Sequence, residues 1–258
     1  ADMRRNKVPI RNAEALLQMR NAGRVVAEMH EECVRAAKPG VTTLDLDRVA
    51  REVLARRGAT SNFLGYHGFP AVICASVNDV VVHGIPSADV VLHEGDIISI
   101  DCGAIVEGWH ADAAITIPIG DIDTESRRVL DAARDALVAA IATVRDGLNL
   151  GQIGAAIEKS VAQTGLAVVE DYSGHGIGRA LHEAPEVSNV AHGADRKFRL
   201  QAGQTIAIEP IVVAGDPETA VRTDGWTVVT LDGSRAAHFE HSLVVTPDGA
   251  DILTLPWG

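Results

Sequence analysis

The feature that most constrains the fold is an internal repeat, because short signals recur in one order at an offset of 107 or 108 residues. Any single match between short runs can arise by chance, but six matches in the same order are much harder to explain that way. The pairs with this offset are Gly40 with Gly147, Gly58 with Gly165, His67-Gly68 with His175-Gly176, and residues 95–101 with 203–209. Two further pairs keep the same order at other spacings: His83-Gly84-Ile85-Pro86 with His182-Glu183-Ala184-Pro185, and, after one insertion of about 20 residues, His110-Ala111-Asp112 with His238-Phe239-Glu240. The repeat predicts one domain over residues 1–258, made of two related halves at about 10–120 and 121–252.

The predicted secondary structure repeats in the same way. Apolar residues at helical spacing predict a helix over residues 12–37, and a capping box at Thr42 to Asp45 begins a second helix that runs to about Arg57, before Gly58. A long and a shorter helix are predicted again over residues 123–144 and 152–163. Stretches rich in β-formers cover residues 71–82, 97–117, 205–213 and 226–245. Each half is therefore expected to consist of two helices and several strands.

Composition excludes some classes of partner. The formal net charge of −12 argues against a broad basic surface, so direct binding to nucleic acid is not expected, although a local patch remains compatible with it. Cys33, Cys74 and Cys102 match neither a disulfide framework nor a zinc-finger spacing, which favours a reducing compartment. The first residues lack the apolar segment of a signal peptide, and no run of about 18 apolar residues predicts a membrane span. We expect a soluble cytoplasmic protein.

Four acidic residues occupy matching positions in the two halves. Side chains alternate along a strand, so Asp101 points to the same face as its small and polar neighbours. Asp101 and Asp112 flank a turn at Glu107-Gly108, and we expect them nearly opposite each other on a hairpin. Glu209 and Glu240 hold the equivalent positions in the second half. The four carboxylates are therefore predicted to converge.

Convergence of four carboxylates between apolar strand faces would be very costly unless protons or cations compensated the charge. Two divalent cations would cancel the four charges, and His175 adds a nitrogen ligand of the kind favoured by Co, Mn, Fe or Zn. The alternative, that each acid is a solvated hairpin residue, is the better explanation for any one of them but a poor one for four in register. A two-metal site would acidify a bridging water, so hydrolysis is the expected reaction.

Five motifs together resemble the type I methionine aminopeptidases, from about residue 8 to residue 252. They are Asn78-Asp79-Val80-Val81-Val82-His83-Gly84-Ile85-Pro86, Ile100-Asp101 followed by His110-Ala111-Asp112, Gly174-His175-Gly176-Ile177-Gly178, Ile208-Glu209-Pro210 and Phe239-Glu240-His241. The resemblance implies the pita-bread fold, an α+β architecture in which two pseudo-symmetric halves of helices pack on a curved antiparallel sheet. It also implies two divalent metal ions per chain, with Asp101 on one, His175 and Glu209 on the other, and Asp112 and Glu240 bridging the pair.

The same resemblance implies an activity and three catalytic residues. Glu209 would move the proton of the bridging water, His182 would stabilise the tetrahedral intermediate at the scissile carbonyl, and His83 would position the peptide and assist the leaving amine. The implied reaction removes the N-terminal methionine from peptides and nascent chains with a small second residue. A monomer in transient contact with the ribosome is the expected form. Without the resemblance, histidines satisfied by backbone groups near a loop would be the better explanation for His83 and His182.

An N-terminal methionine needs a closed apolar pocket for its thioether side chain. The residues at positions that resemble this pocket in the family are Phe63, Tyr66, Phe69, Cys74 and Trp226. Phe63 and Leu181 fall where other members often carry different residues, and a plain core cluster is the alternative for the aromatic group. The roles of His67, His110 and His238 are left open between orienting the carboxylates and a purely structural one.

Three alternatives on the same fold compete with this function. Prolidases and aminopeptidase P share the fold and the ligands, but they carry a sizeable domain ahead of it, whereas the first helix here is predicted near residue 12. The type II methionine aminopeptidases carry a helical insertion in the second half, and no such block is predicted between Val161 and Glu240. A non-catalytic binding protein on the same fold would have lost its metal ligands, and all five ligand types are present here.

Overall fold

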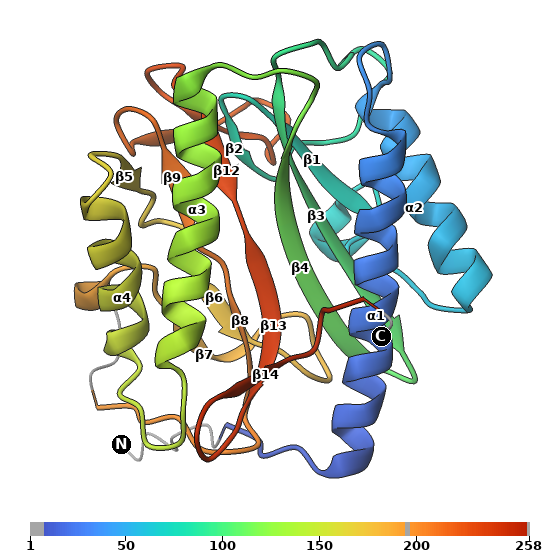
Figure 1. The fold of residues 1–258 in the computed structure, drawn as a ribbon. Coiled ribbons are helices and arrows are strands. Elements are labelled where there is room, and N and C mark those ends of the chain that lie inside the picture. The colour runs from blue at the N-terminus through green and yellow to red at the C-terminus, as the bar shows by residue number, and fades with distance from the viewer. Residues whose placement is uncertain (1–7, 194–196, 257–258) are drawn as a thin grey trace.

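The computed structural model describes residues 8–193 and 197–256, and its centre is a curled antiparallel sheet of eight strands (Figure 1). The strands are β1 (Ile73–Val77), β3 (Ile97–Val106), β4 (Trp109–Pro118), β6 (Gly174–Gly176), β7 (Glu183–Val187), β8 (Thr205–Ile208), β13 (Glu240–Val245) and β14 (Ala250–Ile252). Their order is β1-β3-β4-β13-β8-β6-β7, with β14 paired to β13. Strand β4 therefore lies directly beside β13, which joins the first and second parts of the chain. Residues 1–7, where we expect no signal peptide, lie outside the described range.

Two three-stranded sheets complete the β-structure. The first has the order β10-β11-β2 and the second the order β12-β9-β5. Their strands are β2 (Val80–Val82), β5 (Ala167–Val168), β9 (Ile211–Val213), β10 (Thr219–Val221), β11 (Val228–Thr230) and β12 (Ala236–His238). Val228 pairs with Val82, so the residues next to these strands, Trp226 and His83, are brought together from distant parts of the sequence.

The four helices begin and end where the local signals predict. Helix α1 (Ala13–Ala36) is capped by Asn12, and α2 (Thr43–Arg57) begins with the predicted capping box of Thr42 and ends at Gly58, whose φ is 63°. Helix α3 (Thr124–Thr143) is capped by the Asp123 side chain. It is followed by α4 (Gly151–Ala162). The predictions for all four helices are confirmed to within about two residues.

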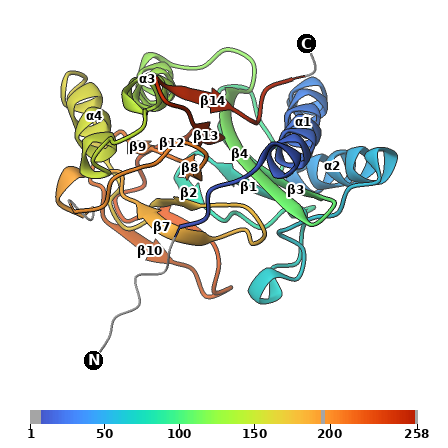
Figure 2. The same ribbon diagram turned by 90° about the horizontal axis from the view of Figure 1, so that it is seen from below.

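All four helices lie on one side of the sheet, as the view from below shows (Figure 2). One buried cluster joins α1, α2, β1, β3 and β4 and includes Met29 and Ile100, while a second joins α3, α4, β8 and β13 and includes Ile153 and Ile206. Burying each such side chain stabilises the fold by roughly 1.5–3 kcal/mol. Because Ile100 faces the helices, the next residue, Asp101, must point to the opposite face of the sheet. That the clusters belong to two related halves of one domain stays our prediction.

The register of the β3–β4 hairpin corrects one expectation about the acids. Asp101 pairs with Ala114, and Asp112 pairs with Gly103, so the two carboxylates are diagonal neighbours and not nearly opposite each other. The two-residue turn places Val106 opposite Trp109, and every later pair follows from that one. Diagonal neighbours on one face remain within reach of each other, and the carboxyl groups of Asp101 and Asp112 do contact.

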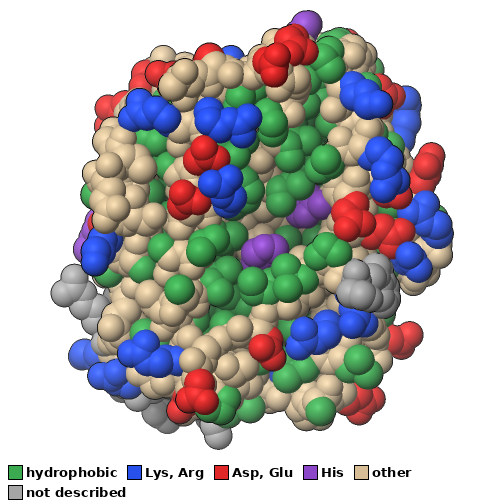
Figure 3. All heavy atoms as spheres, viewed as in Figure 1, with side chains coloured by type: hydrophobic (Ala, Val, Ile, Leu, Met, Phe, Trp, Pro, Cys, Tyr) green, Lys and Arg blue, Asp and Glu red, His purple; other side chains and the backbone are tan. Residues whose placement is uncertain are grey.

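The outer surface of the helix layer mixes charges of both signs. On the described residues of this face, Lys and Arg side chains alternate with Asp and Glu around an apolar strip between α1 and α3 (Figure 3). Within the described ranges, no helix has both the length and the apolar composition needed to cross a bilayer.

Candidate metal centre

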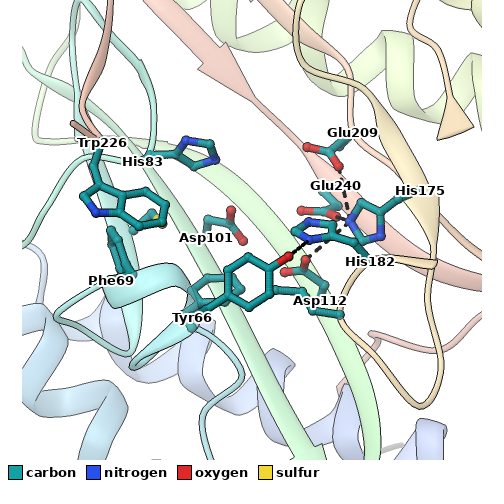
Figure 4. Close-up of a pocket in the computed structure, with 13 residues that line it drawn as sticks. Tyr66, Phe69, His83, Asp101, Asp112, His175, His182, Glu209, Trp226 and Glu240 are labelled. Atoms are coloured by element: carbon teal, nitrogen blue, oxygen red, sulfur yellow. Dashed lines mark hydrogen bonds and ion pairs between the residues drawn. The ribbon is translucent and has the colours of Figure 1, made fainter. Parts of the chain in front are cut away.

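Five adjacent strands each supply one of the five predicted metal ligands. In sheet order, Asp101 lies on β3, Asp112 on β4, Glu240 at the start of β13, Glu209 directly after β8, and His175 on β6. All five line one pocket on the sheet face away from the helices (Figure 4). Strand pairing therefore brings together residues that are up to 139 positions apart in the sequence.

The register explains how closely these carboxylates approach. Ala114 pairs with Asp101 on one side and with Glu240 on the other, so a single small residue separates the two acids across the sheet. Asp112 is held against β13 by Ser242, whose hydroxyl accepts the Asp112 N–H at 3.0 Å and donates to the Asp112 carbonyl at 2.7 Å. The acids thus lie on rigid, paired backbone and not on mobile loops.

The ring of His175 has a defined orientation. Its Nδ1 lies 2.9 Å from the Gly176 carbonyl, which can only accept, so Nδ1 carries the proton and Nε2 keeps its lone pair in the neutral ring. Nε2 lies 3.4 Å from Glu209 Oε1, 3.7 Å from Asp112 Oδ2 and 3.8 Å from Glu240 Oε1. A lone pair that faces three carboxylates is favourable only when a proton or a metal cation lies among them.

Unpaired polar atoms in the pocket test whether metal ions fit. The atoms without a hydrogen-bond partner among the described residues include Asp101 Oδ1, Asp112 Oδ1, Glu240 Oε1 and His238 Nε2. Leaving such atoms unsatisfied costs about 1–3 kcal/mol each, and more for charged groups. The described lining includes no Lys or Arg to offset the charge. Two overlapping groups, Asp112-His175-Glu240 and Glu209-His238-Glu240, bring possible ligand atoms within 4.8 Å of one another, so the residues present fit two divalent ions.

The carboxyl groups of the pocket titrate abnormally without metal. Burial and the nearby Asp101 raise the pKa of Asp112 well above its usual value, and burial together with Asp112 does the same to the pKa of Glu240. Burial raises the pKa of Asp101 to about 6. Burial also opposes ionisation of Glu209, but the neighbouring rings of His238 and His175 outweigh burial, so the pKa of Glu209 is lowered. Glu209 is therefore the acid of this group that keeps its negative charge most readily.

The two predicted catalytic histidines lie on opposite sides of the carboxylates. His83 directly follows β2, in the left-handed region at a φ of 59°, a conformation that is strained for a residue other than glycine. Burial lowers the pKa of the His83 ring. His182 packs edge-on against His175 with ring centroids 4.3 Å apart, and desolvation followed by His175 lowers the pKa of His182 to about 4. Both rings are therefore neutral near pH 7.

Apolar and aromatic residues form the remaining wall of the same pocket. The five predicted wall residues, Phe63, Tyr66, Phe69, Cys74 and Trp226, all line it, and Leu181 joins them. Phe69 and Trp226 meet edge to face with centroids 5.1 Å apart. Cys74 pairs with Asp101 across β1 and β3, so the apolar wall begins one strand away from the first carboxylate.

The three histidines left open by the sequence have different surroundings. His238 Nε2 lies 3.5 Å from Glu209 Oε2, so this residue contacts the carboxylate cluster directly. Its position two residues before Glu240 was the signal that pointed to it. His110 contacts Asn62, with 3.4 Å from Nδ1 to the amide nitrogen, and the exposed His67 packs edge-on against Tyr66. Neither His110 nor His67 is among the residues that line the pocket.

Sequence reasoning missed a clamp on the loop that carries Leu181 and His182. Glu183 pairs with Arg11 and accepts the backbone N–H groups of Arg179 at 2.8 Å and Ala180 at 3.1 Å. The guanidinium groups of Arg11 and Arg179 lie 5.3 Å and 4.1 Å from the ring centroid of Trp109, at the tip of the β3–β4 hairpin. The clamp therefore ties this loop to the start of α1 and to the strands that bear Asp101 and Asp112.

Replacing Arg11 with methionine should destabilise the protein, because it leaves the largely buried Glu183 without its cation. Side-chain exposures of 8% and 18% for the pair make the effect larger than for a surface pair, and we expect a loss of about 2 kcal/mol in the free energy of unfolding. Urea denaturation measures it. The matched control is Arg48→Met, which breaks an exposed pair with Asp45 and should change stability by less than about 0.5 kcal/mol. Equal effects of the two variants would contradict a structural role for the clamp.

A pita-bread fold that gathers four carboxylates and a histidine beside an apolar pocket defines a metal-dependent hydrolase. Residues 17–247 match the sequence pattern of metallopeptidase family M24, and the chain belongs to that family. Methionine aminopeptidase 1 of Mycobacterium tuberculosis is 47% identical over 257 residues, a match that covers 97% of this chain and 96% of that protein. Methionine aminopeptidase 1 of Bacillus subtilis is 44% identical over 237 residues, which cover 92% of this chain and 94% of that protein.

Solved structures agree on the fold. The crystal structure of methionine aminopeptidase from Thermotoga maritima superimposes with a TM-score of 0.93 at 38% identity, and the match covers 96% of this chain and 99% of that one. The prolidase from Pyrococcus furiosus gives a TM-score of 0.78 at 18% identity and is covered over only 66% of its length. At that identity the likeness shows the shared fold alone. The predicted pita-bread architecture is confirmed.

Proposed function

We propose that this chain removes the N-terminal methionine from peptides and nascent proteins. The observation that carries the proposal is that one pocket is lined both by apolar and aromatic residues and by the carboxylate cradle, by which we mean Asp101, Asp112, Glu209 and Glu240. Such a pocket can hold one thioether side chain while the adjoining peptide bond lies at the metal centre. The names of the relatives that match nearly the whole chain support the same substrate.

The proposed metal ligands are the five residues that the resemblance to the family implies, and their convergence in one pocket supports the proposal. By that resemblance Asp101 would hold one divalent ion, His175 and Glu209 would hold the other, and Asp112 and Glu240 would serve both; Co, Mn, Fe and Zn all suit these donors. When bound, the ions supply Lewis acidity and a water that is acidic enough to ionise near neutral pH. Ser242 and the hydrogen bond from His175 to the Gly176 carbonyl keep two of these ligands in place.

Three residues would handle the reacting groups. Glu209 would accept the proton of the attacking water, because it lines the pocket and its lowered pKa leaves it ionised near pH 7. A neutral His182 can donate to the oxygen of the scissile carbonyl as negative charge develops there. His83, on the other side of the carboxylates, would position the peptide and assist departure of the amine. A small second residue is expected because of crowding beside these rings.

The partners and compartment proposed with this function are a nascent chain with a free N-terminal methionine, transient contact with the ribosome, and the cytoplasm. The protein is proposed to act as a monomer without direct contact to nucleic acid. A net charge of −12 supports the last point. Three cysteines that are free and buried support a reducing compartment.

Peptide cleavage by metal-reconstituted protein tests the function. We expect release of methionine from Met-Ala-Ser, much slower release from Met-Leu-Ser, no cleavage of a Gly-Pro peptide, and no activity after chelation of the metals. Cleavage of the Xaa-Pro bond alone would assign the protein to the prolidase side of the fold. Cleavage of neither peptide, with metals bound, would contradict the proposal and favour a binding role.

A further inference from the structure

A hydrogen bond joins the phenol of Tyr66 to the ring of His182 at the mouth of the pocket. Tyr66 Oη lies 2.6 Å from His182 Nδ1, and Figure 4 shows the two side chains meeting between Asp101, Asp112 and Glu240 in this view. The ring centroids are 5.4 Å apart. Because this bond uses Nδ1, the opposite nitrogen of the ring, Nε2, is the one left for a substrate.

Both partners of this hydrogen bond lie on segments that other contacts hold in place. Tyr66 begins the short turn η1 (Tyr66–Gly68), where its N–H donates to the Phe63 carbonyl at 3.0 Å and its carbonyl accepts the Phe69 N–H at 2.9 Å. His182 lies directly before Glu183, the centre of the clamp described above. The contact therefore joins two fixed segments, and the orientation of His182 is defined from both sides.

The chemistry of the pair decides which nitrogen of the neutral ring carries the proton. A phenol, with a pKa of about 10, is a stronger donor than a neutral imidazole N–H, and an imidazole nitrogen is a stronger acceptor than a phenolic oxygen. The favoured bond therefore runs from Tyr66 O–H to His182 Nδ1. With its lone pair used at Nδ1, His182 must carry its proton on Nε2.

We propose that Tyr66 is a positioning residue, whose hydroxyl holds His182 as the Nε2–H tautomer and so directs an N–H toward the scissile carbonyl. The inference rests on the role proposed above for His182. It gives Tyr66 a purpose beyond the apolar wall, where phenylalanine would pack equally well. A ring with its proton on Nδ1 would present a lone pair to the carbonyl oxygen and oppose the reaction.

Kinetics of Tyr66→Phe test the consequence of the bond. We expect kcat for Met-Ala-Ser to fall about tenfold while KM changes less than about twofold, because the loss of one hydrogen bond acts on the reacting carbonyl and not on the methionine side chain. The double variant Tyr66→Phe, His182→Ala should be no slower than His182→Ala alone, since the phenol then has no imidazole to hold. Multiplicative losses in the double variant would overturn the proposal, and so would an unchanged kcat in Tyr66→Phe.

Nitrogen-15 NMR of zinc-loaded protein labelled at histidine reads the tautomer directly, and His182→Ala identifies the signal by its loss. We expect protonated Nε2 and bare Nδ1 in the wild type, and a mixture of tautomers in Tyr66→Phe. Tyr172→Phe, at the only other tyrosine of the chain, is the matched control and should leave the His182 signal in place. A wild-type ring protonated on Nδ1, or a spectrum that Tyr66→Phe leaves unchanged, would refute the role of Tyr66. Since this measurement needs no turnover, absence of methionine release in the wild type would refute the proposed function alone.

Discussion

Replacing Asp112 with asparagine is expected to lower kcat/KM for Met-Ala-Ser by about a thousandfold or more, equivalent to about 4 kcal/mol of transition-state stabilisation. Asp112 is 4% exposed and lies 3.7 Å from His175 Nε2. The amide keeps the shape of the side chain but removes one of the four charges that would balance two divalent ions. It also directs N–H groups or a neutral oxygen at the cations, so the metal content should fall together with the activity.

Metal content by elemental analysis and peptide cleavage should therefore be measured on the same preparation. The matched control is Asp251→Asn, because Asp251 is 61% exposed and only loosely paired with Arg20 at 3.9 Å. That variant should keep full activity and a full metal complement. Retention of more than about a tenth of the activity in Asp112→Asn would show that Asp112 is not a shared ligand.

The second large effect is expected in metal-free protein, where Asp101→Asn should increase stability. The pKa of Asp101 is raised in the folded chain to about 6 from an ordinary value of 3.8. Below pH 3.8 the carboxyl group is protonated in both the folded and the unfolded chain and contributes nothing. Between pH 3.8 and about 6 the unfolded chain loses this proton first, so rising pH favours unfolding. Above about pH 6 the buried Asp101 carboxylate is ionised, and it lowers the free energy of unfolding by its full amount, on the order of 3 kcal/mol.

Urea denaturation of chelator-treated wild type and Asp101→Asn at pH 5 and pH 7.5 measures this difference. We expect the variant to be more stable at both values, with the larger gain, on the order of 3 kcal/mol, at pH 7.5. Histidines such as His30, whose pKa burial lowers to about 4, act on both proteins alike and largely cancel in the comparison. Addition of metal should reverse the order, since only the wild type keeps the Asp101 ligand. A less stable metal-free variant at pH 7.5 would contradict the buried-charge explanation.

The two predictions concern the same buried carboxylates, first with metal bound and then without it. The cradle is unfavourable for folding without metal, because burial raises the pKa values of Asp101, Asp112 and Glu240. With metal, the same buried charges become ligands. Substitution at Asp101 is therefore expected to lower the activity of the metal-loaded protein and to raise the stability of the metal-free protein.

Local features of the fold were predictable from the sequence because their causes are local. The capping box at Thr42 and the left-handed Gly58 define helix α2 through neighbours within a few residues. Alternation along β3 placed Asp101 on the face opposite Ile100. The repeat then located Glu209 and Glu240, and the structure brings these acids into the same pocket.

Counting along the hairpin would have improved one prediction. The turn at Glu107-Gly108 was recognised, and it already implies that Val106 lies opposite Trp109. The diagonal placement of Asp101 and Asp112 follows from that pair. The short strands β6 and β7 were not among the predicted strands, because Gly174–Gly176 and Glu183–Val187 carry no regular alternation of apolar and polar residues.

The helices, the main strands and the acids could be predicted from residue patterns, and the family and its pocket from the resemblance. The contact of His238 with Glu209, the Arg11–Glu183 clamp and the hydrogen bond from Tyr66 to His182 became visible in the folded chain. These three contacts could not be predicted for one physical reason, because each joins side chains at strand ends or on loops that are 29 to 172 residues apart. Such contacts have no periodic signal along the chain, because they depend on the pairing of distant strands and not on the neighbours of either residue.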